Sequence, residues 1–225
     1  MKKIIYHGSE RIIEKPIFGY GKKYNDYGPG FYCTASRELA KEWSVDMLRN
    51  GYANEYEIET DNLNIINLNS EEYCILHWLT LLLKNRQFDI TSPLANEAKE
   101  YLLNNFDVPL YGVDIVTGYR ADDSYFSFAQ DFINGTISYR QLNNAMHLGK
   151  LGEQFVLISR KAFENIKFTG AETAQSSEWY AKKEIRDKTA RKEYFNTERN
   201  KRQRGDIYIT TILDEEMKPV DERLR

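Results

Sequence analysis

Apolar and polar positions alternate over several short stretches of the chain, and this pattern predicts β-strands. The clearest case is residues 56–60, where Tyr56, Ile58 and Thr60 alternate with glutamates, the period of a strand with one face in water. Residues 63–68 are expected to extend it. A strand at residues 3–6 is expected to end at His7-Gly8-Ser9. The other expected strands are 31–34, 113–116, 154–159, 166–168 and 207–213.

Elsewhere apolar residues recur at intervals of three and four, which predicts helices. Ser36 is the expected N-cap of the first, which runs to about Arg49 and stops before Gly51. The other expected helices are 70–83, one beginning at Pro93, 125–133, 139–148 and a long charged helix over 176–204. Strands and helices do not follow a regular βαβ order, so the sequence predicts an α+β fold.

The length and composition limit the class of protein. A chain of 225 residues fits one domain with an appendage. We expect one main domain over residues 1–175 and a basic helical extension over 176–225 packed on the same domain. No apolar run approaches the roughly 18 to 20 residues of a membrane span, and the first ten residues lack the core of a secretory signal. We therefore expect a cytoplasmic protein without a membrane partner.

Cysteine use and charge add two further expectations. Cys33 and Cys74 form no CxxC pair and have no histidine at metal-ligand spacing, so we expect neither a disulfide framework nor a metal site. Net charge is −3, yet residues 182–204 contain ten basic residues against four acids. This segment could follow a phosphate backbone, or it could be a solvated helix with paired charges.

Two segments near the N-terminus contain residues suited to binding a nucleotide. In Tyr6-His7-Gly8-Ser9 the histidine can hydrogen-bond a ligand hydroxyl, and the glycine lets a ligand approach the backbone. The second segment reads Asp26-Tyr27-Gly28-Pro29-Gly30-Phe31-Tyr32-Cys33-Thr34. Its glycines and proline predict a tight turn, and an aromatic ring after the turn can offer its face to a heterocycle such as nicotinamide.

Together these segments resemble the N-terminal signatures of ADP-ribosyltransferases of the His-Tyr-Glu type, and in particular the bacterial family called domain of unknown function 3990. The resemblance covers roughly residues 4–168. It implies a split β-sandwich around an NAD⁺ cleft, with inserted helices and the charged C-terminal extension. It implies that His7 holds the nicotinamide ribose, that the Gly8 backbone binds the carboxamide and that Tyr32 stacks on nicotinamide. Further NAD⁺-binding positions are Ser9, Gly30 and Thr34.

The third family element is an acidic residue that opens a late strand. Here the segment begins Gly152-Glu153-Gln154, and Gln154 stands in the register of the usual glutamate. Glutamine can hydrogen-bond a ribose but cannot act as a base, so a mechanism that needs a carboxylate would use Glu153 or another acid. Successive strand residues face opposite ways, so the two side chains share the cleft only if the strand begins between them.

Other polar residues are candidate substrate contacts. The polar turn over residues 118–123 contains Arg120, Asp122 and Asp123. Its Ala-Asp-Asp sequence also resembles a turn found in the family. The aspartates could contact substrate or cap the next helix. Asp26, in the second segment, is a further candidate.

The resemblance predicts a mono-ADP-ribosyltransferase that takes NAD⁺ as a substrate, needs no metal and modifies a nucleic acid or a protein. No GxGxxG motif joins a strand to a helix, which speaks against NAD⁺ as a redox cofactor. The family implies a toxin of a toxin-antitoxin or phage-defence system, with an antitoxin partner. The alternatives are an NAD⁺ glycohydrolase and a non-catalytic binding module for nucleic acid or protein in which Gln154 marks lost activity.

Overall fold

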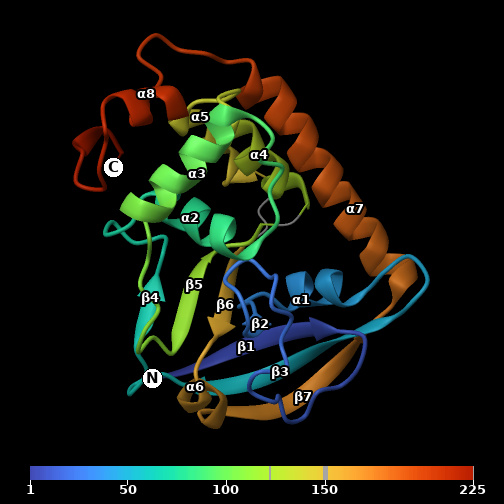
Figure 1. Cartoon of the computed structure of the whole chain (residues 1–225). Coiled ribbons are helices and arrows are strands. Elements are labelled where there is room, and N and C mark those ends of the chain that lie inside the picture. Colours follow the sequence, from blue (N-terminus) through green and yellow to red (C-terminus); the bar gives the residue numbers. More distant parts are fainter. Residues whose placement is uncertain (122, 149–151, 225) are drawn as a thin grey trace.

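The computed structural model describes residues 1–121, 123–148 and 152–224, together with the side chains of these residues except 123 and 124. Its architecture is α+β, as the element pattern predicts. Two sheets fill one half of the molecule and most helices gather over the other half, with the long helix α7, Ser176–Glu193, along one side (Figure 1).

The first sheet has three antiparallel strands in the order β1-β3-β7. These are Lys2–Ser9, Gly51–Glu59 and Ile166–Ala174. β1 does not end at His7: it continues through Ser9, which pairs with Tyr52 of β3. β7 is six residues longer than expected, because it pairs along β3 as far as Gly51. An extended first strand therefore keeps His7 on a fixed backbone rather than in a turn.

The second sheet has the order β2-β6-β5-β4. Its strands are β2 Phe31–Cys33, β4 Ile65–Asn67, β5 Ile115–Tyr119 and β6 Glu153–Leu157. β4 runs parallel to β5, so residues 63–68 do not extend the 56–60 strand as expected. They cross to the other sheet. Apolar side chains of both sheets, such as Ile5, Phe31, Tyr56 and Phe155, form one core between them.

The helices begin at polar caps in several places. Ser36 accepts a hydrogen bond from the Leu39 amide, as expected, and Ser92 and Ser138 cap two later helices in the same way. Besides α7, the helices are α1 Arg37–Ser44, α2 Ile75–Asn85, α3 Pro93–Asn105, α4 Asp123–Ile133, α5 Tyr139–Ala145, α6 Arg160–Glu164 and α8 Ile209–Asp214.

Several expected helix boundaries were wrong, and the helix expected over 139–148 ends at Ala145. α1 ends at Ser44 because the backbone turns back at once: Asp46 accepts hydrogen bonds from the Leu48 and Arg49 amides and holds the turn. α2 begins at residue 75, not 70. α7 passes into a π-helical turn, Tyr194–Arg199, and the helical segment ends there rather than at residue 204.

Residues 207–213 form no strand. Residues 209–213 belong to α8, because Ile209 and Ile212 lie three residues apart and both are buried in the core of the helical half. Tyr194, Met217 and Leu224 belong to the same core. The segment after residue 175 is thus packed on the rest of the chain through apolar contacts, and a domain boundary at 175 stays a prediction. In the described parts of the chain, the helices are too short or too polar to cross a membrane.

Candidate functional site

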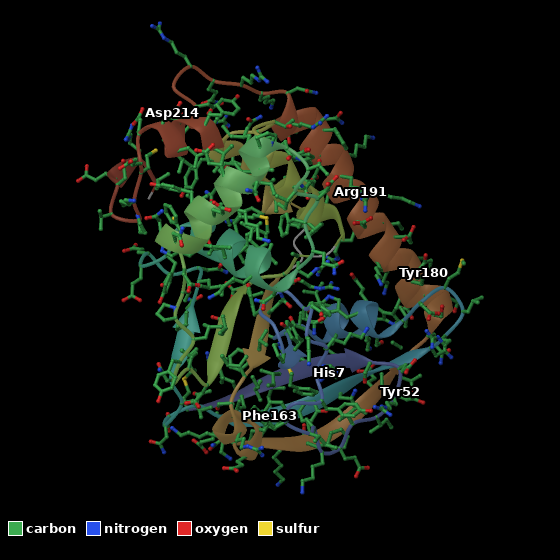
Figure 2. All side chains as sticks on the ribbon, in the orientation of Figure 1. His7, Tyr52, Phe163, Tyr180, Arg191 and Asp214 are labelled. Atoms are coloured by element: carbon green, nitrogen blue, oxygen red, sulfur yellow. The ribbon has the colours of Figure 1, made fainter. Side chains whose placement is uncertain are left out.

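The two sheets meet beside the ends of β1 and β2. Tyr6 and Thr34 exchange backbone hydrogen bonds of 2.8 and 2.9 Å, which form a bridge between the sheets. The bridge brings His7, the next residue on β1, against Tyr32 on β2. Figure 2 shows His7 within the sheet half, far from Arg191 and Asp214 on the outer helices. Two segments that are 25 residues apart in sequence therefore become neighbours.

His7 is held in one orientation by two contacts. Its Nδ1 lies 2.7 Å from the Tyr32 carbonyl oxygen, and its ring stacks on Phe31 with centroids 4.3 Å apart. A carbonyl can only accept, so Nδ1 carries the proton and Nε2 keeps a lone pair. Burial lowers the pKa of His7, which keeps the ring neutral at pH 7. The residue therefore offers an acceptor for a ligand hydroxyl.

Tyr32 is fixed through its hydroxyl. The hydroxyl donates to the Gly28 carbonyl at 2.7 Å and accepts from the Tyr27 amide at 2.9 Å. Both partners belong to the preceding turn, in which Gly28 has a φ of +78° that favours glycine. Burial raises the pKa of the Tyr32 phenol far above its ordinary value, so it stays neutral. The turn and the ring are thus one rigid unit.

Gln154 and Glu153 face opposite ways at the start of β6. Gln154 is only 3% exposed and donates from Nε2 to Asp26 Oδ2 at 2.7 Å and to the Tyr119 carbonyl at 3.2 Å. Glu153 is exposed and its carboxylate accepts from Asn69, away from His7 and Tyr32. The strand includes both residues, so their alternation sends only Gln154 inward.

Asp26 is the buried carboxylate nearest to Gln154. Its Oδ2 also accepts from the Ala121 amide at 2.9 Å, and its Oδ1 accepts from Arg86 Nη1 at 2.7 Å. Arg86 follows α2 and packs over the Phe126 ring. Burial raises the pKa of Asp26, while the donors from Ala121, Arg86 and Gln154 oppose that rise. The carboxylate connects the turn before β2 to β5, β6 and the helical half.

These residues line a cleft with two parts. The smaller, of about 190 Å³, is called the inner part because its lining includes the buried residues Asp26, Ala121 and Gln154, and the larger, of about 900 Å³, is called the outer part. Both parts are lined by His7, Gly8, Asn25, Tyr32, Trp43 and Arg120. The inner part adds Asp26, Arg86, Ala121 and Gln154. The outer part adds Ser9, Gly30 and most of the loop over residues 11–22. The outer volume lies in the range of small-molecule sites.

The glycines of the two signatures have packing roles. A Cβ on Gly8 would lie 2.1 Å from the Ala40 carbonyl oxygen, so only glycine lets α1 cross β1 this closely. A Cβ on Gly30 would lie 2.7 Å from Val156. Close approach of a ligand was the expected role of Gly8. The structure adds a second role, because the absence of a side chain at Gly8 makes room for α1.

Not every residue predicted for the site lies in the cleft. Thr34 is buried at the bridge with Tyr6 and lines neither part of the cleft. Glu153 points away from it. Asp122 and the Asp123 side chain lie outside the described residues. Arg120 does line the cleft, with its guanidinium 4.4 Å from the centre of the Trp43 ring.

The sequence patterns missed three contributors. The spacing of Trp43 predicted only a position on the apolar face of a helix. Arg86 and Asn54 belong to no recognised motif, so neither was predicted to be part of the site. Asn54 is fully buried and ties the loop after β1 to the sheet, since it bonds Ser9, the Arg11 carbonyl and the Ile13 amide. Asn54 lies two residues before Tyr56, on the face of the strand that is otherwise apolar, and a polar residue at that position was the signal that could have identified it.

Comparison with known proteins gives one match. The model of the family described as "Protein of unknown function (DUF3990)" matches residues 3–168, about three quarters of the chain. No curated protein and no solved structure matches. The match contains both N-terminal signatures and strand β6, which contains Gln154. The chain therefore belongs to the DUF3990 family.

Proposed function

We propose that the protein is a mono-ADP-ribosyltransferase that cleaves NAD⁺ and transfers ADP-ribose to a macromolecule. One observation supports this most: His7, Tyr32 and Gln154, from three separate strands, line one cleft in orientations that suit NAD⁺. The resemblance of their sequence segments to the His-Tyr-Glu signatures supports the same function. A split β-sandwich of the ADP-ribosyltransferase type is part of this proposal.

The polar atoms of the cleft suit a ribose. His7 Nε2 and Gln154 Oε1 are acceptors, and a ribose offers hydroxyl donors on neighbouring carbons. Tyr32 presents an aromatic ring on which nicotinamide can stack. Binding in this way would hold the nicotinamide end of NAD⁺ in the inner cleft and leave the outer cleft for the ADP end.

The reaction needs orientation and charge stabilisation. The bond between ribose C1′ and the pyridinium nitrogen breaks, and its electron pair leaves with neutral nicotinamide. Positive charge then develops on the ribose, which a cleft of fixed acceptors stabilises. A nucleophile of the acceptor forms the new bond at C1′ and releases its proton. If water took this place, the protein would be an NAD⁺ glycohydrolase.

The acceptor, the toxin role and the antitoxin partner rest on the family resemblance. The proposed acceptor is a nucleic acid or a protein, and one assay distinguishes these two classes. Purified protein is incubated with labelled NAD⁺ and a cell lysate, and separate portions are treated with nuclease and with protease. The digestion that releases the label identifies the acceptor class, and label in free ADP-ribose alone indicates hydrolysis.

Tyr32→Ala is the critical variant. It removes the stacking ring, and we expect nicotinamide release to fall about 100-fold because misplacement of the reacting bond is costly. Tyr111→Ala is the matched control, since Tyr111 is fully exposed and should retain full activity. Tyr32→Phe keeps the ring and checks that loss of the hydroxyl bonds is not the cause. Equal activity of Tyr32→Ala and wild type, or no nicotinamide release from wild type, would contradict the proposal.

The pH dependence of binding gives a second test. Protonation would turn His7 Nε2 from an acceptor into a donor, and the lowered pKa means that this happens only below the ordinary value of 6.5. NAD⁺ affinity, measured by calorimetry, is therefore expected to stay constant from about pH 8 to 6.5. A loss of affinity already at pH 7 would count against the neutral histidine.

A further inference from the structure

Asp26 is buried among hydrogen-bond donors. It is 4% exposed, and in the described part of the chain three groups donate to its carboxylate oxygens: the Arg86 guanidinium, the Ala121 amide and the Gln154 amide. A protonated carboxyl would need an acceptor for its own proton, whereas an ionised one satisfies all three donors. The surroundings therefore suit a negative charge inside the cleft.

The same hydrogen bonds fix the Gln154 side chain. Its Nε2 lies between Asp26 Oδ2 and the Tyr119 carbonyl, and both of these atoms accept. The amide cannot flip without placing its oxygen against two acceptors. The carbonyl of Tyr119 is itself held by donors from Tyr27 and Trp78. Gln154 Oε1 is therefore the end of the amide that is left for a ligand, and in the described part of the chain no hydrogen bond reaches it.

A carboxylate that accepts from an amide N–H polarises the amide. Electron density moves toward the amide oxygen, and the effect is strongest where water is excluded. Gln154 Oε1 thus becomes a better acceptor for a ribose hydroxyl than an unassisted glutamine would be. The charge also lies close to the region where the ribose becomes positive.

We propose that Asp26 supplies the negative charge of this site and acts on the ribose through Gln154, as a positioning residue. The pair takes the place of the single glutamate of the His-Tyr-Glu pattern. This inference rests on the proposed function. It also explains why glutamate would not suit position 154: a second carboxylate 2.7 Å from Asp26 could not ionise together with it.

The test compares two variants of one buried pair. Asp26→Asn keeps the shape and the acceptor oxygen but removes the charge, whereas Arg86→Gln breaks the same ion pair and, at an assay pH of about 8 that keeps the carboxyl ionised without its cation, leaves the charge beside Gln154. For Asp26→Asn we expect kcat for nicotinamide release to fall about 100-fold while the NAD⁺ KM changes less than about threefold. For Arg86→Gln we expect a similar drop in melting temperature but less than about a tenfold loss in kcat.

The variant Gln154→Glu provides an independent test of the proposal. The proposal predicts a kcat below that of wild type, because two carboxylates then compete for one charge. A gain in kcat for Gln154→Glu would overturn the proposal. Equal kcat losses in Asp26→Asn and Arg86→Gln, in proportion to their losses in melting temperature, would also overturn it. Full activity of Asp26→Asn in an active background would overturn this inference alone. A wild-type protein that releases no nicotinamide would overturn the proposed function as well.

NMR spectroscopy tests the hydrogen bond between Gln154 and Asp26 without depending on catalytic turnover. The side-chain amide proton of Gln154 that faces Asp26 is expected downfield in the NMR spectrum, because it donates to a carboxylate. It should move upfield in Asp26→Asn and stay in place in Arg86→Gln. Unchanged signals in Asp26→Asn would show that the carboxylate does not polarise the amide, and would overturn the proposal.

Discussion

Two segments of the chain are rich in lysine and arginine: the loop between β1 and β2, and helix α7. In α7 many cations are neutralised in place. Lys182, Lys188 and Arg191 each pair with an acid four residues earlier, and Arg186 forms a bidentate pair with Glu42 of α1. In the loop, Arg11, Lys15 and Lys22 line the outer cleft, and among the described residues they have no carboxylate within 4 Å. The count of charges along the sequence left open whether residues 182–204 follow a phosphate backbone or form a solvated helix with paired charges. The ion pairs of α7 support the second alternative for that helix, and the loop is the stronger candidate for binding an anion.

The largest effect is expected at the buried pair of α7. Glu42 is 3% exposed, so Arg186→Ala would leave its carboxylate in the interior without its cation. We expect the free energy of unfolding to fall by about 3 kcal/mol, which chemical denaturation measures. The double variant Glu42→Gln with Arg186→Gln removes both charges and should regain part of the loss. A single-variant loss below about 1 kcal/mol would mean that Arg186 is solvated like the rest of the helix.

An intermediate effect is expected in the loop. Lys15→Gln and Lys22→Gln each remove a cation near the part of the cleft assigned to the ADP end of NAD⁺. Exposed ion pairs contribute up to about 1 kcal/mol, so we expect the NAD⁺ dissociation constant to rise about two- to fivefold at low salt. The increase should shrink in high salt because exposed charges are screened. Unchanged affinity at low salt would place the ADP end elsewhere.

The smallest effect is expected on the outer side of α7. Lys188→Gln and Lys192→Gln change exposed positions, and the Glu184 partner of Lys188 is itself partly exposed. The free energy of unfolding should change by less than about 0.5 kcal/mol and the NAD⁺ dissociation constant should not change. These variants are the charge-matched controls for the loop. A loss of NAD⁺ binding as large as that of Lys22→Gln would remove the distinction between the two segments.

The sequence patterns predicted much of the fold but were weaker on its connections. Caps such as Ser36, and the strand pattern around Ile58, depend on neighbouring residues, so they could be identified locally. The predictions for residues 63–68 and 207–213 were wrong because a short apolar run is compatible with a strand, a helix or the edge of another sheet. For residues 207–213, the core that buries Ile209 and Ile212 decides in favour of a helix. The early end of α1 follows from the Asp46 turn, which its apolar spacing did not indicate.

The sequence by itself determined the two N-terminal signature segments and the place of Gln154 beside the start of a late strand. Those features follow from motifs and from the apolar run after Gln154. The direction of Glu153 needed the structure, in which β6 begins at Glu153 and includes both residues, so that their side chains alternate. Only the tertiary structure decided that Asp26, 128 residues from Gln154 in sequence, bonds its amide, and that Arg86 and Trp43 join the same cleft. The physical reason is that a buried charge requires donors, and folding can supply them from any part of the chain.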